Sequence, residues 1–365
     1  MEAENFMDEF GPEKIVITYD PKTKVKGILV IDNTALGVGK GGIRIVPDLT
    51  LMEVRRLARA MTWKNAIAGL PFGGAKSGIK GDPQGDKISM LKTFGKALRY
   101  LSPREYIAAP DMNTGEEEIK AFVEGVGDKN AATGKPEALG GIPHELGSTG
   151  FGVAESAEVA AGSIGIGLKG ATVAIEGFGN VGSFTMKFLS EKGAKIVAVS
   201  DSKGTIYDPN GLSYDELMKT KREAGAVTKH SSGKALSTEE LFSLDVDILV
   251  PGARPDVITE RDVGNIKARI IVEAANIPVK PESERLLYKR RVLIVPDIIA
   301  NAGGVISSYV EYTGGNKEAA FKLITEKIKT NTKLILDKAN TDFISPRAAA
   351  QAIAKERVIA AMRKS

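Results

Sequence analysis

Residues 175–182 read Ile-Glu-Gly-Phe-Gly-Asn-Val-Gly, and this stretch decides the fold of the second half of the chain. The glycines have the spacing G-x-G-x-x-G. An apolar run, Ala171–Glu176, precedes them and predicts a strand, and helical periodicity follows. A strand, a glycine turn and a helix in this order are typical of a dinucleotide-binding unit, although a glycine turn without a ligand would have the same local pattern.

The same stretch predicts where a dinucleotide would lie. The glycines allow a tight turn and close approach of the pyrophosphate, and the helix N-terminus offers N–H groups to it. The expected contacts are Gly177, Gly179, Asn180, Val181 and Gly182. Asp201, 19 positions after Gly182, would accept hydrogen bonds from the adenosine ribose and favours NAD. Ser202 and Lys203 could instead contact a 2′-phosphate, so NAD and NADP both stay open.

Four further apolar runs extend this pattern outward. They are Lys195–Ser200, Asp245–Val250, Ala268–Glu273 and Arg291–Val295. Short buried strands with intervening helices predict a parallel, doubly wound sheet. From Lys317 onward the chain is expected to be helical.

The first half has a different layout. Lys14–Tyr19 and Lys26–Ile31 are expected strands. Thr50 and Glu53 form a capping box for a helix that ends near Ala68, with Gly69 as its stop. A glycine-rich loop, 70–78, and helices near 87–100 and 115–125 should follow.

The chain is therefore expected to be an α/β protein with two domains around a cleft. Residues 1–148 form a substrate-binding α/β domain, and residues 149–331 form a Rossmann-like dinucleotide-binding domain. The glycine-dense stretch 139–152 is the expected hinge. A C-terminal helical segment, 332–365, should pack back on the first domain.

Composition excludes several classes of protein. The chain has 365 residues, 42% hydrophobic and 26% charged, as in ordinary globular proteins. It has no cysteine, which excludes disulfides and thiolate metal sites, and no metal site is expected. The net charge of +4 is small and interspersed, which does not suggest nucleic-acid binding. No apolar run could span a membrane and Met1–Phe10 lacks a basic leader, so a cytoplasmic protein is expected.

Three lysines of the first half lie at or beside glycine turns: Lys40, Lys64 and Lys76. A lysine usually belongs to a solvated face, but bare glycine backbone lets a ligand come close. Clustered lysines would lower one another's pKa and bind anions. Asp111, after Pro110, could equally be a turn residue. No motif requires His144 or His230.

Six ordered motifs resemble the glutamate/leucine/phenylalanine/valine dehydrogenase superfamily over nearly the whole chain. They are Lys40-Gly41-Gly42-Ile43-Arg44, Met61-Thr62-Trp63-Lys64-Asn65, Leu70-Pro71-Phe72-Gly73-Gly74-Ala75-Lys76, Pro110-Asp111, Gly177–Gly182 and Asn301-Ala302-Gly303-Gly304-Val305. The resemblance implies an NAD(P)-dependent enzyme that interconverts an L-amino acid with its 2-oxo acid and ammonia. It also implies a homo-oligomer, often a hexamer.

The resemblance assigns roles to individual residues. Lys64 would bind the substrate α-carboxylate, Lys76 would activate water, and Asp111 would move protons at the amino nitrogen. Thr149, Asn276 and Asn301 correspond to family positions near the nicotinamide and its ribose. Lys40 and Ser308 correspond to positions that hold the γ-carboxylate in glutamate-specific members, so L-glutamate and 2-oxoglutarate are the expected substrates.

Two alternatives remain at this stage. The segment Asn33–Gly37 resembles leucine dehydrogenases, which favours an apolar amino acid such as leucine or valine. The second alternative is a non-catalytic dinucleotide-binding subunit, but such a protein would not need Lys76 and Asp111 together.

Overall fold

A computed structural model of the chain describes residues 7–143 and 146–364, so His144 lies outside the described residues. The chain divides into two compact units. Unit 1 comprises Met1–Leu146, Val305–Ala320 and Ile353–Ser365, and unit 2 comprises Gly147–Gly304 and Phe321–Ala352. Each unit contains its own sheet with helices packed on it, which confirms the predicted two-domain α/β class.

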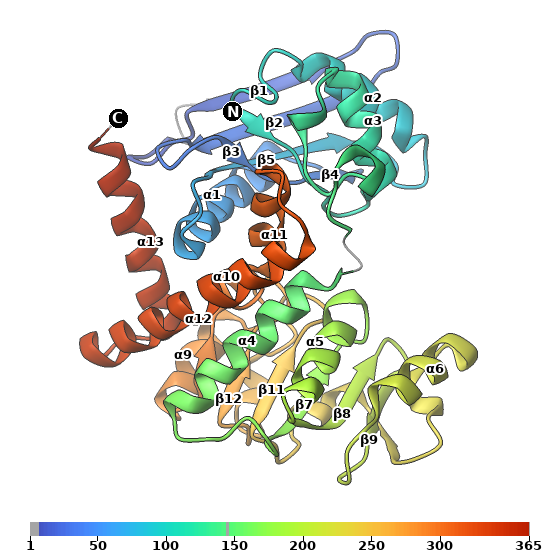
Figure 1. Cartoon of the computed structure of the whole chain (residues 1–365), viewed down its shortest axis with the longest axis vertical. Coiled ribbons are helices and arrows are strands. Elements are labelled where there is room, and N and C mark those ends of the chain that lie inside the picture. Colours follow the sequence, from blue (N-terminus) through green and yellow to red (C-terminus); the bar gives the residue numbers. More distant parts are fainter. Residues whose placement is uncertain (1–6, 144–145, 365) are drawn as a thin grey trace. The chain divides into compact units, whose positions relative to one another are not determined.

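Unit 1 is built on a mixed sheet with the strand order β1-β2-β5-β3-β6, and β4 also pairs with β5. Its strands are β1 Lys14–Tyr19, β2 Lys26–Asn33, β3 Gly39–Lys40, β4 Ile43–Val46, β5 Gly73–Lys80 and β6 Tyr106–Ile107. Helices α2 (Lys87–Leu98) and α3 (Glu116–Val126) lie side by side (Figure 1). They bring Phe94 and Phe122 together at 6.2 Å between ring centroids. These rings belong to the same buried core as Leu29 and Ile79 of the sheet.

Helix α1 (Leu51–Ala68) begins and ends where its sequence predicts. The Thr50 hydroxyl accepts a hydrogen bond from Glu53 N at 3.2 Å and satisfies one of the N–H groups of the first turn. Gly69 takes the left-handed conformation with φ 66°, which glycine adopts without steric cost. Both ends are therefore encoded locally.

Unit 2 is built on a seven-stranded sheet with the order β10-β9-β8-β7-β11-β12-β13. The parallel strands are β7 Thr172–Glu176, β8 Lys195–Asp201, β11 Ile248–Pro251, β12 Ile270–Val272 and β13 Leu293–Val295. All five expected apolar runs form strands, and the predicted parallel sheet is confirmed. Two antiparallel strands, β9 (Gly204–Tyr207) and β10 (Lys234–Leu236), extend its edge beyond that prediction. The reversal into β9 is tight, because Asp201 pairs directly with Gly204.

In unit 2, helix α4 (Ser148–Ser163) packs on α5 (Asn180–Glu191) (Figure 1). The ring centroids of Phe151 and Phe188 are 5.0 Å apart in this contact. The other helices from α4 onward range from 4 to 26 residues in length. The full set is α4 Ser148–Ser163, α5 Asn180–Glu191, α6 Tyr214–Ala224, α7 Thr238–Phe242, α8 Glu260–Val263, α9 Pro281–Lys289, α10 Asp297–Ala300, α11 Gly303–Tyr312, α12 Lys317–Asp342 and α13 Pro346–Met362.

The division differs from the expected domain boundaries in the C-terminal third. Residues 305–320 group with unit 1, although the sequence placed them in the second domain. The cause is the packing of α11, because Tyr309 contacts Phe72 at 5.5 Å and Glu311 binds Lys135 at 2.8 Å. In the segment 332–365, only Ile353–Ser365 belongs to unit 1, where Arg357 donates hydrogen bonds to the carbonyls of Ala66 and Ile67.

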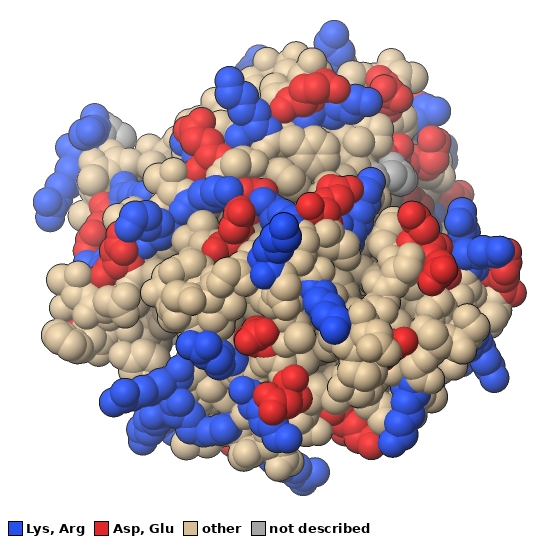
Figure 2. All heavy atoms as spheres, turned by 60° about the horizontal axis from the view of Figure 1, so that its bottom comes forward, with Lys and Arg blue, Asp and Glu red and all other residues tan. Residues whose placement is uncertain are grey.

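Basic and acidic side chains occur together across the face drawn in Figure 2. Among the described helices, none combines the length and the apolar character that crossing a membrane requires.

Candidate active site and dinucleotide-binding motif

Lys76 lies on a strand, which corrects the expectation of a glycine-rich loop over 70–78. Residues 73–80 form β5, the buried strand that joins β2 to β3. Its glycines permit very close packing, because a Cβ on Gly74 would stand 2.0 Å from Thr62 Oγ1 of α1. The glycine run therefore seats the strand against α1, and the rigid sheet fixes the lysine.

Lys76 and Asp111 form a direct ion pair. Lys76 Nζ lies 2.9 Å from Asp111 Oδ2, and Arg44 Nε donates to the same oxygen at 2.8 Å. Arg44 also pairs with Glu53 at 2.5 Å. The backbone N–H of Asp111 donates to Thr114 Oγ1, which orients the turn that carries the carboxylate.

Burial and charge set the protonation of this pair. Burial is the largest influence on Lys76 and lowers its pKa, and the Arg44 charge lowers it further against the opposing effect of Asp111. Burial opposes ionisation of Asp111, but Lys76 and Arg44 outweigh it and hold the pKa of that carboxyl below its usual range. The pair thus couples an ionised carboxylate to an amine that gives up its proton more readily than an exposed lysine.

Lys40 is more deeply buried than Lys76 and Lys135, because only 1% of it is exposed. It lies on β3, between β5 and β6. Its Nζ donates to the Ala108 carbonyl at 2.8 Å, the acceptor that the described part of the chain supplies. An ammonium has three donors, so two remain for a ligand.

The pKa of Lys40 is lowered to about 7. Burial is the largest cause, the charges of Lys76 and Lys135 lower it further, and Glu311 opposes them. The expected mutual repulsion of lysines is therefore present, but loss of hydration is the larger effect. An anion that entered this site would restore the charged form of Lys40.

Glu311 and Lys135 are functional candidates that the sequence did not indicate. Glu311 of α11 has a side chain only 2% exposed and accepts hydrogen bonds from Gly134 N, Ile142 N and Lys135 Nζ. Ser308 is half-buried and precedes Glu311 by three residues, so the two share a face of α11. Ser308 therefore lies on the same helix as Glu311, whose negative charge raises the pKa of Lys40.

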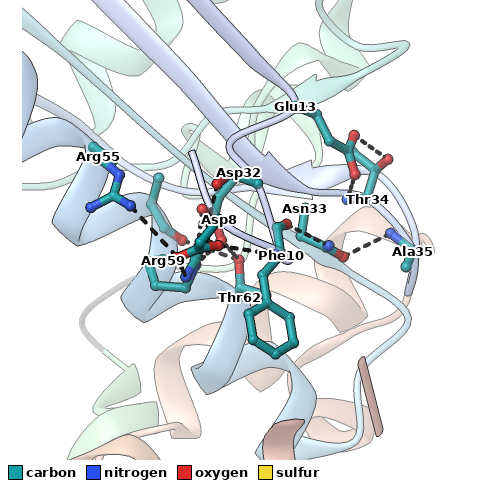
Figure 3. A network of polar contacts seen from close by, with 12 residues as sticks. Asp8, Phe10, Glu13, Asp32, Asn33, Thr34, Ala35, Arg55, Arg59 and Thr62 are labelled. Carbon is teal, nitrogen blue, oxygen red and sulfur yellow. Dashed lines mark hydrogen bonds and ion pairs between the residues drawn. The ribbon is translucent and has the colours of Figure 1, made fainter. Parts of the chain in front are cut away.

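Lys64 is half-buried near the C-terminal end of α1. A polar network that runs from exposed Asp8 to buried Asp32 anchors that helix (Figure 3). Arg59 binds Asp32 of β2 through Nε at 2.8 Å and Asp8 through Nη2 at 2.7 Å. Thr62 Oγ1 donates to Asp32 at 2.5 Å. Burial raises the pKa of Asp32, which Arg59 and Thr62 partly offset. The network ties the turn before Lys64 to the sheet.

The glycine motif of unit 2 has the geometry of a phosphate cradle. A Cβ on Gly182 would stand 1.8 Å from Gly177 O, and Gly177 itself has φ 100°. Gly179 is different, because a Cβ there would meet nothing within 4 Å. It is the N-cap of the 12-residue helix α5, with no side-chain cap. Asn180 and Val181 form its first turn, so its N–H groups and positive dipole end suit a pyrophosphate.

Asp201 ends β8, as expected, but its carboxylate is already engaged. Oδ2 accepts from Lys221 Nζ at 2.6 Å and from Val227 N at 2.9 Å, and Oδ1 accepts from Lys203 N at 2.8 Å. Ser202 is exposed in the turn beside it. The Lys221 partner, which the sequence did not indicate, offsets the negative charge that would otherwise meet a 2′-phosphate.

Two of the three residues predicted at the nicotinamide end contact each other in unit 2, and the third, Thr149, lies beside Gly304. Asn301 Nδ2 donates to Asn276 Oδ1 at 3.0 Å. A Cβ on Gly304 would stand 2.9 Å from Thr149 Oγ1, so the glycines after Asn301 are what allow α11 to begin against α4. In contrast, no cluster of three or more histidines and acids suited to a metal occurs among the described residues.

Two family models match the chain. Residues 12–127 match "Glu/Leu/Phe/Val dehydrogenase, dimerisation domain", and residues 140–365 match "Glutamate/Leucine/Phenylalanine/Valine dehydrogenase". With the Lys76–Asp111 pair and the phosphate cradle, these matches define the class of the protein: the chain belongs to the glutamate/leucine/phenylalanine/valine dehydrogenase family. It is an NAD(P)-dependent amino-acid dehydrogenase.

Several relatives are named for glutamate. The chain is 43% identical to a glutamate dehydrogenase of Aeropyrum pernix, over 91% of this chain and 84% of that protein. It is 39% identical to an NADP-specific glutamate dehydrogenase of Saccharolobus shibatae, over 91% of this chain and 83% of that protein. It is also 39% identical to an NAD-specific one of Staphylococcus aureus, over 91% and 84%. The names therefore divide between the two cofactors.

Solved structures agree with the fold. The hetero-hexameric glutamate dehydrogenase of Thermus thermophilus, in its leucine-bound form, is 29% identical with a TM-score of 0.86, covering 96% of this chain and 89% of that one. The L-tryptophan dehydrogenase of Nostoc punctiforme is 27% identical with a TM-score of 0.77, covering 97% and 98%. The family likeness thus includes members with different amino-acid substrates.

Proposed function

We propose that this enzyme catalyses the reversible oxidative deamination of L-glutamate to 2-oxoglutarate and ammonia with NAD or NADP. The observation that carries the proposal is the buried Lys40. Its ammonium has donors to spare beside a second, partly neutralised lysine, Lys135. A dicarboxylate substrate supplies the missing counter-charge.

The energetics favour a substrate with a side-chain carboxylate. An ammonium buried against an apolar side chain would be unpaired, and an uncompensated buried charge costs about 3–5 kcal/mol. A γ-carboxylate removes that cost and adds charge-assisted hydrogen bonds. Ser308, on the face of α11 that also carries Glu311, would donate a further hydrogen bond to it.

The other candidate residues of unit 1 would each perform a different part of the reaction. Lys64 would hold the α-carboxylate. Asp111, kept ionised by Arg44, would accept a proton from the substrate amino group, and Lys76 would take a proton from the water that attacks the iminium carbon. Burial of Lys76 favours this role, because a lysine is a base only when its pKa approaches the working pH.

The residues of unit 2 would hold the cofactor, which supplies the hydride acceptor. Gly177, Gly179, Asn180, Val181 and Gly182 fit its pyrophosphate, and Asp201 and Ser202 lie where the adenosine ribose would come. Thr149, Asn276 and Asn301 would hold the nicotinamide end. The open space at Gly179 supports this assignment.

An apolar amino acid is the second candidate. The tryptophan dehydrogenase in the comparison supports it, since that protein shares the fold over 97% of this chain. Lys40 distinguishes the two candidates, because its charge favours a substrate with a side-chain carboxylate and not an apolar one. A hexamer is proposed from the hetero-hexameric relative and the dimerisation-domain match, with identical subunits as the family resemblance implies. Light scattering after size exclusion tests the number of subunits. The cytoplasmic location stays a prediction.

The test is the substitution Lys40→Leu with Lys80→Leu as its matched control. Lys80 is an exposed lysine at the end of β5. We expect kcat/KM for glutamate to fall by about 10²-fold or more in Lys40→Leu, while kcat/KM for leucine is unchanged or rises. Lys80→Leu should keep the wild-type values for both. Retention of glutamate turnover in a folded Lys40→Leu protein would refute the proposal.

A further inference from the structure

One arginine of unit 2 gathers three buried carboxylates. Arg347 of α13 binds Glu284 through Nε at 2.5 Å, Asp297 through Nη1 at 2.8 Å and Glu273 through Nη2 at 2.5 Å. The exposed fractions of these acidic side chains are 9%, 5% and 0%. If all three acids were ionised, one guanidinium could not balance their charge.

Two of these acids also accept backbone hydrogen bonds, and one of these bonds comes from the segment 273–277. Glu273 Oε2 accepts a hydrogen bond from Asp297 N at 2.8 Å, and Asp297 Oδ2 accepts one from Ile277 N at 3.0 Å. Ile277 has φ 44°, a left-handed conformation that is strained for a β-branched residue. The Asp297 carboxylate therefore stabilises a strained turn at the end of the segment.

The segment carries Asn276, and the same acids support its partner. Asn301 Nδ2 donates to Asn276 Oδ1 at 3.0 Å and to the carbonyls of Ala274 and Ala275 at 3.3 Å and 3.2 Å. Asn301 follows α10 directly, and Asp297 is the first residue of that helix. The positions of both asparagines therefore depend on the contact between Glu273 and Asp297.

We infer that Arg347, Glu273 and Asp297 are positioning residues that orient the Asn276–Asn301 pair toward the nicotinamide end of the cofactor, and that this positioning weakens when the Glu273 carboxyl loses its proton. The inference rests on the proposed function, in which unit 2 binds NAD(P).

Charge explains the dependence on the proton. The groups that face Glu273 are Arg347 from α13, Asp297 from α10 and Glu284 from α9. Burial is the largest influence and raises the pKa of Glu273 to about 8; Asp297 and Glu284 raise it as well, and Arg347 opposes them. Glu273 Oε1 is buried with no hydrogen-bond partner among the described residues. Ionisation therefore gives Glu273 a negative charge, although its Oε1 has no donor in the described part of the chain, and the charges of Asp297 and Glu284 repel it.

The test compares wild type with Glu273→Gln, which keeps the shape of the protonated acid. Binding of reduced cofactor is followed by nicotinamide fluorescence between about pH 7 and about pH 9.5, across the shifted pKa. ADP serves as a probe that lacks the nicotinamide. We expect the Kd for reduced cofactor to rise several-fold above pH 8 in wild type and to stay flat in Glu273→Gln, with the Kd for ADP flat in both. Glu282→Gln, an exposed glutamate of α9, is the matched control and should behave as wild type.

Amide hydrogen exchange of residues 273–277 gives a second readout that needs no cofactor. Relative to the intrinsic exchange rate, Ile277 should open more above pH 8 in wild type but not in Glu273→Gln. Equal pH dependence of cofactor binding in both proteins, or none in wild type, overturns the inference and leaves the proposed function intact. Failure of wild type to bind either nucleotide overturns the proposed function, and the inference with it.

Discussion

Lys40 is a buried lysine whose ionisation the proposed substrate would change. The lowered pKa of about 7 means that the free enzyme carries this lysine partly neutral at physiological pH. A bound dicarboxylate would favour the charged form, because an opposite charge nearby raises the pKa of a lysine. Substrate binding should therefore draw a proton from solution.

Calorimetry of glutarate binding in buffers of different ionisation enthalpy measures that proton. Near pH 8 we expect uptake of a large fraction of one proton and an affinity that falls as pH rises through 7 and above. The sign follows because the protonated lysine is the binding form, and deprotonation removes it. Lys40→Met should abolish the uptake; uptake that persists in Lys40→Met would place its source elsewhere.

Lys221 governs cofactor choice in this account. Its ammonium covers Asp201 Oδ2 at 2.6 Å and offsets the charge that would repel a 2′-phosphate. Lys221→Ala should therefore shift the ratio of kcat/KM for NAD over NADP toward NAD by about tenfold, which corresponds to ~1.4 kcal/mol. Lys219→Ala, an exposed lysine of the same helix, is the control. An unchanged ratio in Lys221→Ala would mean that Asp201 does not face the ribose.

At the scale of elements, glycines fix how closely the segments of unit 2 approach. A Cβ on Gly182 of α5 would stand 1.8 Å from Gly177 O, whereas a Cβ on Gly162 of α4 would meet nothing within 4 Å. Gly182→Ala should lose ~1–3 kcal/mol or more through overpacking against rigid backbone. Gly162→Ala should gain ~0.4–1 kcal/mol through the reduced freedom of its unfolded chain. Thermal unfolding of both variants measures the contrast, and equal effects would contradict this packing.

The elements that could be predicted are those with local signals. Thr50 and Gly69 encode the ends of α1, and the apolar runs encode the parallel strands of unit 2. Strand β5 could not be predicted as a strand, because its glycines have poor strand propensity and its place depends on close contact with Thr62. The non-local partners were equally hidden: 176 residues separate Lys135 from Glu311.

The residues of the candidate site likewise divide into those that the sequence indicated and those that it did not. Resemblance pointed to Lys76 and Asp111, and the structure joins them in one ion pair. Arg44, which also binds Asp111, belongs to the motif Lys40–Arg44, but nothing in the local sequence indicates that it reaches Asp111. Lys221 lies 20 residues beyond Asp201 in the sequence and belongs to no recognised motif.

The whole molecule assigns its two tasks to two units with separate cores. Unit 1 holds the lysines, Asp111 and Ser308, and unit 2 holds the phosphate cradle and the asparagine pair. The C-terminal third contributes to both, since α11 brings Glu311 to unit 1 and α13 brings Arg347 to unit 2. A simple division of the sequence into two blocks misses this, because the contacts of α11 and α13 are with residues far away in the chain.

The central claim is that a buried lysine selects L-glutamate. It is tested most directly by oxidation of a panel of L-amino acids (glutamate, leucine, valine and tryptophan), with NAD and NADP in parallel and reduced nicotinamide read by absorbance. The account predicts that kcat/KM for glutamate exceeds that for the apolar amino acids by about 10²-fold or more. A preference for leucine, valine or tryptophan would contradict it, because Lys40 could not then face the substrate side chain.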